Sequence, residues 1–449
     1  MRVQKNISGR KNEPGFIITL VAVFMLFVVG AMAALAIDVV TLYTARSEAQ
    51  LAADAGALAG ARVLANSGMT SEASLEANAE TLAKTIAKQV ATNNDVGGTK
   101  LVNRDVTVTV NDNTPSNPRV TVQIQVNTLP TFFARIWGNR TLAVAASATA
   151  EAYNPSANNI SGGGPPVAPI CVKPWLLPNM DPTKTAAAAG PIFGSDGSIS
   201  NPTLVGQTWP NATAANGLYA LCGGDCSGGA ISPPSPGMYY PGAIDGPAPD
   251  FPTPTQVPAC AAGFNSYQMA VAGCVQQPIS CGVNSANNPS SINIDQTAYG
   301  PTRDADTVQA AGCLIHYNVP GGLPGDSDGI DIVTTPNPPY EFLGGKQNPV
   351  TGAENKPVVV SDSLVTIPVI NVPDPPGSAP TSPTSPVTVI GFLQVLLNPY
   401  PTAVFPPPLT PTQIPAMIIN MAGCGSGAAG QPILGNGASP VAVRLITPP

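Results

Sequence analysis

The stretch Phe16–Ile37, FIITLVAVFMLFVVGAMAALAI, decides how the chain is organised, because it continues for 22 residues without a charged side chain. At about 1.5 Å per residue, a helix of this length spans roughly 33 Å, close to the hydrocarbon thickness of a bilayer. A helix buried in a soluble core is disfavoured at this length. We therefore predict a single transmembrane helix at 16–37.

The charges on either side of this segment predict its orientation. The residues before it are mainly basic: Arg2, Lys5, Arg10 and Lys11, against Glu13. The charged residues after it are Asp38, Arg46, Glu48 and Asp54. Basic residues stay preferentially on the cytoplasmic side of a membrane. We expect residues 1–15 to form a cytoplasmic basic tail, the helix to contact the lipid bilayer, and the body to lie outside the cytoplasm.

Two kinds of processing would shorten the N-terminus. Ala31-Met32-Ala33 fits a signal-peptidase site, although the apolar run passes through it to Ile37. Cleavage after Gly15 would make the chain a type IV prepilin. That class typically carries glutamate at the fifth mature position, where this chain has Leu20. Both alternatives stay open.

The composition limits both the fold and the function. The 449 residues carry a formal net charge of -7, and only 10% are charged. A nucleic-acid-binding protein would need a clustered basic surface, so that class is disfavoured. The chain contains 51 Pro and 44 Gly, and Pro interrupts helices. Most of the chain is therefore expected to form strands, turns and irregular segments.

The single histidine, His316, argues against an enzyme. A Ser-His-Asp or Cys-His catalyst would depend on it, and no G-x-S-x-G motif lies nearby. We interpret it as a histidine at a strand edge beside Cys313. No catalytic, cofactor-binding or metal-binding residue is nominated, and no small-molecule substrate is evident.

Residues 38–153 are expected to form a small helix and sheet domain. The alanine-rich stretch after Ile37 favours helix and extends the first helix to Leu64. A second helix is predicted from a cap at Thr70 or Ser71 to about Asn93. Three antiparallel strands are predicted from their alternating or strand-like patterns: 106–110, 120–126 and 142–150.

Small residues recur at four-residue spacing in the first helix, as Gly30 and Ala34 and again as Gly56 and Gly60. Such spacing lets another helix approach closely. The small residues could serve a partner helix, or they could seat this helix on its own domain. The sequence alone leaves both interpretations open.

Residues 154–169 are a linker by composition, and residues 170–449 are expected to form a Pro/Gly-rich β domain with long loops. Residues 170–356 are broken into short pieces by Pro, Gly, Asn and Ser. Regular strands are predicted beyond them: 358–360, 364–372, 387–397 and 416–421. Residues 373–386 are interpreted as a stiff connector. The overall fold class is therefore α+β.

All eight cysteines lie beyond residue 170. An even number of cysteines in an oxidising compartment indicates a disulfide framework. Cys222–Cys226 and Cys274–Cys281 are plausible local pairs, although the spacing does not determine connectivity. Zinc binding is a weaker alternative, since there is one histidine and no C-x₂-C pair.

A family resemblance emerges just beyond the apolar run. Asp38, Tyr43, Arg46, Gln50, Ala52–Ala55 and Ala57–Ala61 follow a motif that closely resembles the N-terminal Tad domain of TadG-like Flp pilus-assembly proteins. The chain departs from that motif at Val40, Ala49 and Gly56. The resemblance is confined to the N-terminal part of the chain.

This resemblance implies a role in a pilus or tight-adherence secretion system of a bacterial envelope, at the inner membrane, with other Tad/Flp proteins as partners. The family has no established enzymatic activity. Many TadG-like proteins add a von Willebrand-type metal-binding domain with a D-x-S-x-S motif. Residues 196–200 copy that motif, but the preceding residues 190–195 make a poor strand, so we expect a turn.

Asp38 lies directly after the apolar run. A carboxylate within a membrane would suggest a functional contact, for example with a basic group on a partner. The preferred interpretation is a solvated, interfacial carboxylate.

The leading functional hypothesis is a non-catalytic, membrane-anchored assembly component. The alternative is a surface-exposed minor pilin or adhesin that is processed at its N-terminus. A periplasmic enzyme is disfavoured, because the sequence shows no recognisable nucleophile or metal cluster.

Overall fold

The structure is a computed structural model, and it confirms an α+β fold with a long N-terminal helix. It describes residues 14–131, 133, 141–157, 167–185, 187–195, 197–209, 219–220, 234–244, 251–281, 291–295, 301–317, 326–331, 333–335, 337–371, 384–400, 414–424, 433–434 and 439–446.

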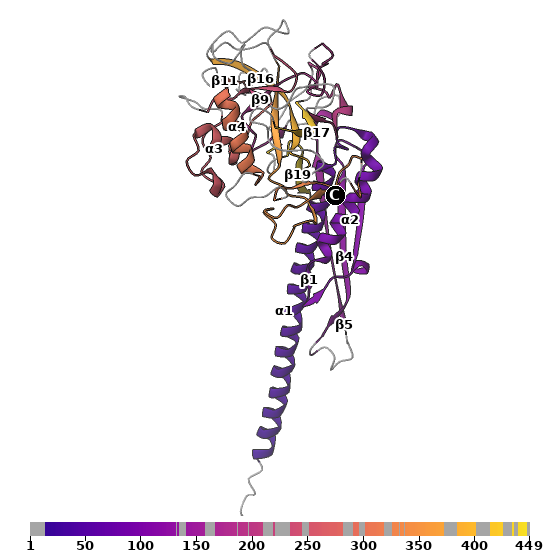
Figure 1. Ribbon diagram of the computed structural model, residues 1–449. Helices are drawn as coiled ribbons and strands as arrows, with labels where there is room; N and C mark the ends of the chain where they lie inside the picture. The colour runs from indigo at the N-terminus through magenta and orange to yellow at the C-terminus, as the bar shows by residue number, and fades with distance from the viewer. Residues whose placement is uncertain are drawn as a thin grey trace, which may run out of the picture.

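The first helix, α1 (Pro14–Asn66), is 53 residues long. Its N-terminal half projects from the molecule, and its C-terminal half enters the body (Figure 1). The helix ends two residues beyond the predicted Leu64. Gly68 then turns the chain with a φ of +79°. A Cβ atom there would collide with Val205 and with the carbonyl of Ile419, so this turn requires glycine.

The second helix begins later than predicted. A short 3-10 helix, η1 (Ala73–Leu75), precedes α2 (Glu76–Thr92), and the Glu72 side chain accepts a hydrogen bond from the backbone N–H of Ser74. Thr70 and Ser71 do not cap this helix, because both hydroxyls hydrogen-bond to Asn420. α2 packs on α1 through its small buried residues Ala79, Ala83, Ala87 and Ala91.

The three predicted N-terminal strands are confirmed as β3 (Val106–Asn111), β4 (Arg119–Pro130) and β5 (Thr141–Tyr153). They pair antiparallel, and a fourth strand, β19 (Ala442–Ile446), joins β5, which gives the order β19-β5-β4-β3. β19 was not predicted. Residues from the far end of the sequence thus complete the N-terminal sheet, across the boundary expected at residue 170.

A larger sheet forms the body. Seven of its strands follow the order β8-β17-β16-β15-β7-β10-β9, and β11 pairs with β16. Their bounds are β7 (Trp175–Pro178), β8 (Thr208–Trp209), β9 (Tyr219–Ala220), β10 (Met238–Pro241), β11 (Ser291–Asp295), β15 (Leu364–Asn371), β16 (Thr384–Leu397) and β17 (Ala416–Gly423). The smaller strands are β1 (Asp95–Val96), β2 (Thr99–Lys100), β6 (Val167–Ala168), β12 (Gly329–Ile330), β13 (Phe342–Leu343), β14 (Pro357–Val358) and β18 (Ile433–Leu434).

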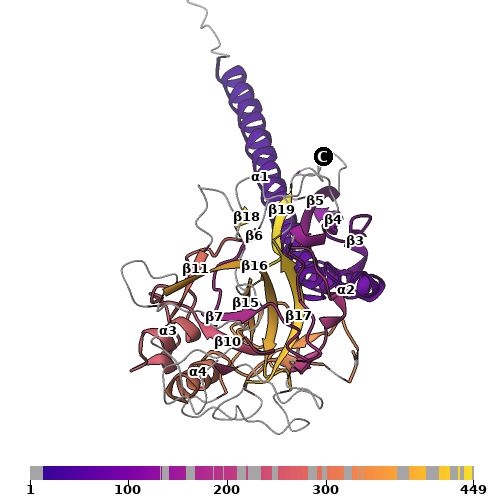
Figure 2. The same ribbon diagram turned by 90° about the horizontal axis from the view of Figure 1, so that it is seen from above.

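Two helices of the body were missed in the broken region 170–356: α3 (Ser266–Ala272) and α4 (Pro301–Leu314). They lie on the opposite side of the body sheet from α2 (Figure 2). The other 3-10 helices among the described residues are η2 (Asn103–Asp105), η4 (Pro155–Ala157), η5 (Pro202–Leu204) and η6 (Ala259–Ala261).

The predicted strands of the body are confirmed at 364–372, 387–397 and 416–421 within one to three residues at their ends. The strand at 358–360 is shorter, because β14 ends at Val358. Residues 373–383 of the expected connector 373–386 lie outside the described residues. Its last three residues belong to β16 and pair with β11.

Among the described residues, three disulfides link distant parts of the body: Cys171–Cys274, Cys260–Cys313 and Cys281–Cys424. The predicted pair Cys274–Cys281 is therefore wrong, because each cysteine bonds a residue much farther away in the sequence. The pair Cys222–Cys226 lies outside the described residues. The six described cysteines are in disulfides, so the zinc alternative does not hold for them.

Breaking the longest cross-link should loosen the body sheet. Cys281 and Cys424 are separated by 143 residues, and loss of a disulfide typically costs about 2 to 5 kcal/mol. We expect a Cys281→Ser, Cys424→Ser double variant to have a free energy of unfolding lower by that amount, and hence a lower urea midpoint, measured by near-UV circular dichroism in detergent. An unchanged midpoint under non-reducing conditions would contradict this linkage.

Candidate functional site

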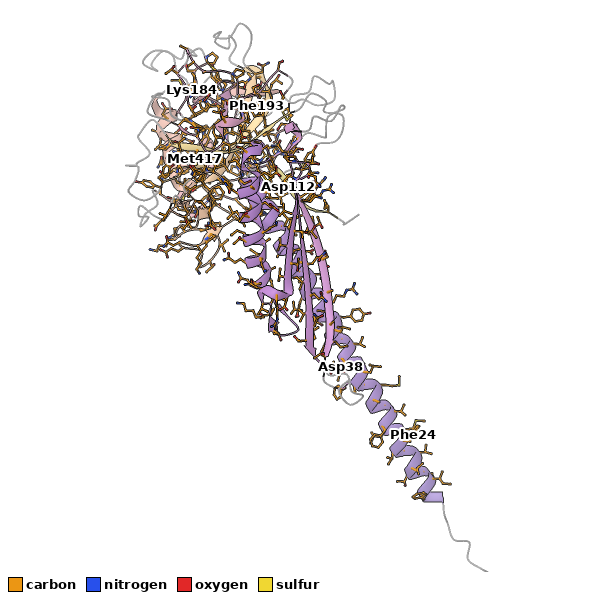
Figure 3. All side chains as sticks on the ribbon, turned by 90° about the vertical axis from the view of Figure 1, so that its right-hand side faces the viewer. Phe24, Asp38, Asp112, Lys184, Phe193 and Met417 are labelled. Atoms are coloured by element: carbon orange, nitrogen blue, oxygen red, sulfur yellow. A yellow bond between two sulfur atoms is a disulfide. The ribbon has the colours of Figure 1, made fainter. Side chains whose placement is uncertain are left out.

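The N-terminal half of α1 exposes its apolar side chains. Phe16, Phe24 and Leu26 are 64–76% exposed, and Figure 3 shows Phe24 on the bare part of the helix. Among the described residues, α1 is the one helix long and apolar enough to cross a membrane. Exposed hydrocarbon of this extent is unfavourable in water. This segment therefore provides a membrane-anchoring surface.

Asp38 marks the point where the projecting helix meets the sheet (Figure 3). Its side chain is only 4% exposed, and its two carboxylate oxygens lie 3.1 and 3.4 Å from the Phe133 amide nitrogen, which donates the hydrogen bond. The interpretation of Asp38 as a solvated carboxylate was therefore wrong. A charge-assisted hydrogen bond instead fastens the end of the β4–β5 region to the helix.

The burial of Ala34 extends this contact toward the membrane. Ala34 lies one helical turn before Asp38 on the same face and is also buried. Both residues lie among exposed apolar neighbours such as Val39 and Val40. The folded domain thus reaches the last turn of the apolar run rather than ending beyond it.

Gly56 and Gly60 seat α1 on its own domain. A Cβ atom on Gly60 would lie 2.8 Å from Val120 and 3.1 Å from Ala87, and one on Gly56 would lie 3.0 Å from the Ala87 carbonyl oxygen. These close contacts favour the interpretation that the small residues seat α1 on its own domain rather than on a partner helix. Gly30 has no atom within 4 Å of the equivalent position.

The other residues of the Tad-like motif divide into two groups. Gln50 donates to the Asp54 carboxylate at 2.8 Å and to the Ser147 carbonyl of β5 at 3.2 Å, so this polar pair holds α1 to the sheet. Tyr43 and Arg46 are exposed. These two side chains remain accessible just above the apolar run.

A buried polar junction joins the end of α1 to the body sheet. Asn420, on β17, donates from Nδ2 to the Ala65 carbonyl at 2.5 Å and to the Thr70 hydroxyl at 2.9 Å. Asn154 donates to the Met421 carbonyl at 2.8 Å and to the same Thr70 hydroxyl at 3.2 Å. Buried polar networks fix one relative orientation of the elements that they join. Sequence analysis missed Asn420, although a lone amide in the apolar strand 416–421 was a usable signal.

A buried carboxylate fixes the unpredicted strand β19. Glu151, on β5, is 3% exposed and accepts from Arg444 of β19 at 2.6 Å. Arg119 of β4 lies 3.7 Å from its other oxygen. One carboxylate thus bridges three strands of the N-terminal sheet.

Two side chains that could carry catalysis, His316 and Lys173, have structural partners. His316 does not lie at a strand edge but follows α4, and its Nε2 lies 3.1 Å from the Asp362 carboxylate. Lys173 is buried and donates to the carbonyls of Val271 and Gly273, each at 2.7 Å, at the end of α3. Burial lowers the pKa of Lys173 to about 7, and attraction by Asp362 partly opposes that shift.

The D-x-S-x-S copy forms a tight turn over its described residues, as expected. The amide of Gly194 donates to the Ser198 carbonyl at 2.8 Å, and Phe193 bridges Ile199. Asp196 lies outside the described residues. Within the described part of the chain, His, Cys, Asp and Glu side chains form no group of three that could hold a metal ion.

Comparison with known families confirms the resemblance found at the N-terminus. Residues 15–63 match the Tad family model, described as putative Flp pilus-assembly TadE/G-like. The match covers the exposed apolar run, Asp38, Gly56 and Gly60. No match was found among curated proteins or among solved structures. This segment, a membrane-anchoring helix of the Tad type, supports a role in Flp pilus assembly.

The glycine contacts predict a contrast between two positions of α1. Gly60→Leu should destabilise the N-terminal domain by about 1 to 3 kcal/mol, because the larger side chain must displace Val120 and Ala87. Gly30→Leu is the matched control and should leave the stability unchanged. Chemical unfolding of both variants in detergent measures the difference, and equal stabilities would contradict the packing.

The buried lysine predicts a pH dependence. Because the pKa of Lys173 falls from 10.5 to about 7 on folding, the unfolded chain binds more protons between these values. The free energy of unfolding should therefore rise with pH in this range, by at most about 1.4 kcal/mol per pH unit. In Lys173→Met this contribution should vanish, as urea unfolding from pH 7 to 10 would show. Lys346→Met, at an exposed position, controls for the change in net charge. If the free energy of unfolding of Lys173→Met rose with pH as steeply as that of the wild type, Lys173 would not be the cause of the pH dependence.

Proposed function

We propose that this protein is a non-catalytic component of Tad/Flp pilus assembly or tight-adherence secretion, anchored in the bacterial inner membrane and acting outside the cytoplasm. The observation that carries the proposal is the exposed apolar half of α1, which matches the Tad family and continues without interruption into the folded body. α1 anchors the protein in the membrane, and the body acts on other pilus-assembly proteins.

The orientation rests on charge and on cysteine chemistry. Arg2, Lys5, Arg10 and Lys11 precede the apolar run, which favours a cytoplasmic N-terminus. The three disulfides of the body favour an oxidising compartment. Both observations support a single-pass protein whose bulk is extracytoplasmic.

We assign the parts of the chain accordingly. Residues 1–15 form the cytoplasmic tail, 16–37 the transmembrane helix, and 38–153 the Tad-like domain, which β19 completes. Residues 154–169 connect it to the β domain at 170–449. The buried junction at Asn420 makes these parts one mechanical unit, so that a force on the body would reach the membrane helix.

The non-catalytic role is supported by the surroundings of the reactive side chains. Within the described residues, Lys173 is engaged by two backbone carbonyls and His316 by Asp362. The Trp175, Tyr239, Tyr267 and Thr307 side chains hydrogen-bond to one another in the core. These contacts hold the fold together, as expected of a structural component.

Fractionation and intact mass test the proposal against the alternative of a processed minor pilin or adhesin. We expect the full chain, from Met1, in the inner-membrane fraction, with the body accessible to protease only from outside the cytoplasm. A mature chain starting at Phe16, or shortened after Ala33, would support the alternative. A full-length chain in the cytosol would exclude both.

The Asp38 contact predicts a separable defect. Asp38→Ala removes the acceptor for the Phe133 amide and frees the end of the β4–β5 region from α1. We expect fewer assembled pili by electron microscopy, with unchanged insertion in the membrane fraction. Asp112→Ala, at the opposite end of the same domain from Asp38 (Figure 3), is the control. Pilus numbers equal to wild type in Asp38→Ala would contradict a role for this contact.

A further inference from the structure

An apolar groove lies beside α1 just beyond the membrane anchor. It has a volume of about 290 Å³, and its walls come from α1, the β1–β2 turn and the membrane-proximal ends of β4 and β5. Val40, Leu42, Leu129 and Leu142 supply much of its lining. The tip of the β1–β2 turn leaves open space at Gly98, where a Cβ atom would meet nothing within 4 Å.

The polar groups of this lining already have partners within the chain. The Thr41 hydroxyl donates to the Asp38 carbonyl at 2.8 Å, and the Thr44 hydroxyl donates to the Val40 carbonyl at 3.1 Å. The Glu48 carboxylate accepts from the Gly97 amide at 2.7 Å. What the groove offers to an occupant is therefore mainly hydrocarbon, and burial of further hydrocarbon there is favourable.

The groove is continuous with the surface that faces the bilayer. Val40 lies three residues beyond Ile37, or about 4.5 Å along the helix axis, which is within the headgroup layer of a bilayer. Val39, Val40 and Tyr43 are exposed and extend the apolar surface of the anchor to the mouth of the groove. A lipid chain can thus reach the groove along exposed apolar side chains of α1.

The size of the groove favours a narrow occupant. An α-helix with its side chains is about 10 to 12 Å wide, and a volume of about 290 Å³ accommodates only a slender chain or a single side chain. An acyl chain of a neighbouring phospholipid satisfies the size, the chemistry and the access. A partner helix satisfies only the chemistry.

We infer that this groove, lined by Val40, Leu42, Leu129 and Leu142, binds one acyl chain of a phospholipid from the adjacent leaflet. The inference rests on the proposed membrane anchoring. The bound chain would cover the apolar junction between α1 and the sheet and hold the domain against the membrane surface.

Photolabelling with a lipid tests the inference. The full-length protein is placed in vesicles of phosphatidylethanolamine and phosphatidylglycerol that contain a phosphatidylglycerol with a photoactivatable acyl chain. We expect adducts within residues 40–48 and at 97–98, located by peptide mass spectrometry, in addition to adducts along 16–37. Thr44→Trp places a large side chain in the groove from an exposed wall and should abolish the adducts at 40–48 and 97–98.

Ser47→Trp is the matched control, because Ser47 is exposed on the same helix but does not line the groove. It should keep the groove adducts. Equal midpoints of thermal unfolding for the two variants would show that Thr44→Trp fills the groove without unfolding the domain. Adducts along 16–37 without any in the groove would overturn the inference and leave the anchor intact. Recovery of the wild type outside the membrane would overturn the proposed function itself. If a photoreactive amino acid placed at position 44 cross-linked to a second protein chain in place of lipid, the groove would be assigned to a protein.

Discussion

One unbroken helix has to suit two environments, lipid along its first half and the protein interior along its second half. The rest of the structure depends on this constraint. The first half of α1 exposes large hydrocarbon side chains in every direction, while the second half buries small residues against α2 and the N-terminal sheet. Each square ångström of exposed hydrocarbon costs about 25 cal/mol in water, so the first half belongs in lipid. The second half belongs in the protein, because alanine and glycine let α2 and β4 come close. The boundary between these environments lies at Ala34 to Asp38.

Apolar packing alone does not fix how the body sits on this helix. Hydrophobic contacts are not directional, and the faces of α1 are smooth alanine surfaces. Orientation comes from hydrogen bonds at three heights: Asp38 with the Phe133 amide, Gln50 with β5, and Asn420 with the end of α1. Together they leave little freedom for the helix to rotate against the sheet.

Local patterns were enough to predict the elements, but long-range contacts were not. The apolar run and the alanine-rich extension predicted α1 almost to its end, and the alternation at 106–126 predicted β3 and β4, because each pattern lies within the element itself. The partners of Thr70, Cys274 and Cys281 lie far away in the sequence, so their true contacts left no local signal. Asp38 was misjudged for the same reason, since the group that buries it comes from the β4–β5 region. α4 was missed, although Pro301 at its first position and Ala310-Ala311 were usable signals.

The late strand β19 has a consequence for how the protein matures. Glu151 and Arg444 are 293 residues apart in the chain, so the sheet that packs on α1 stays unfinished until the C-terminal residues have been synthesised. Until residues 442–446 arrive, β5 presents an unpaired edge, a surface that other strands can capture.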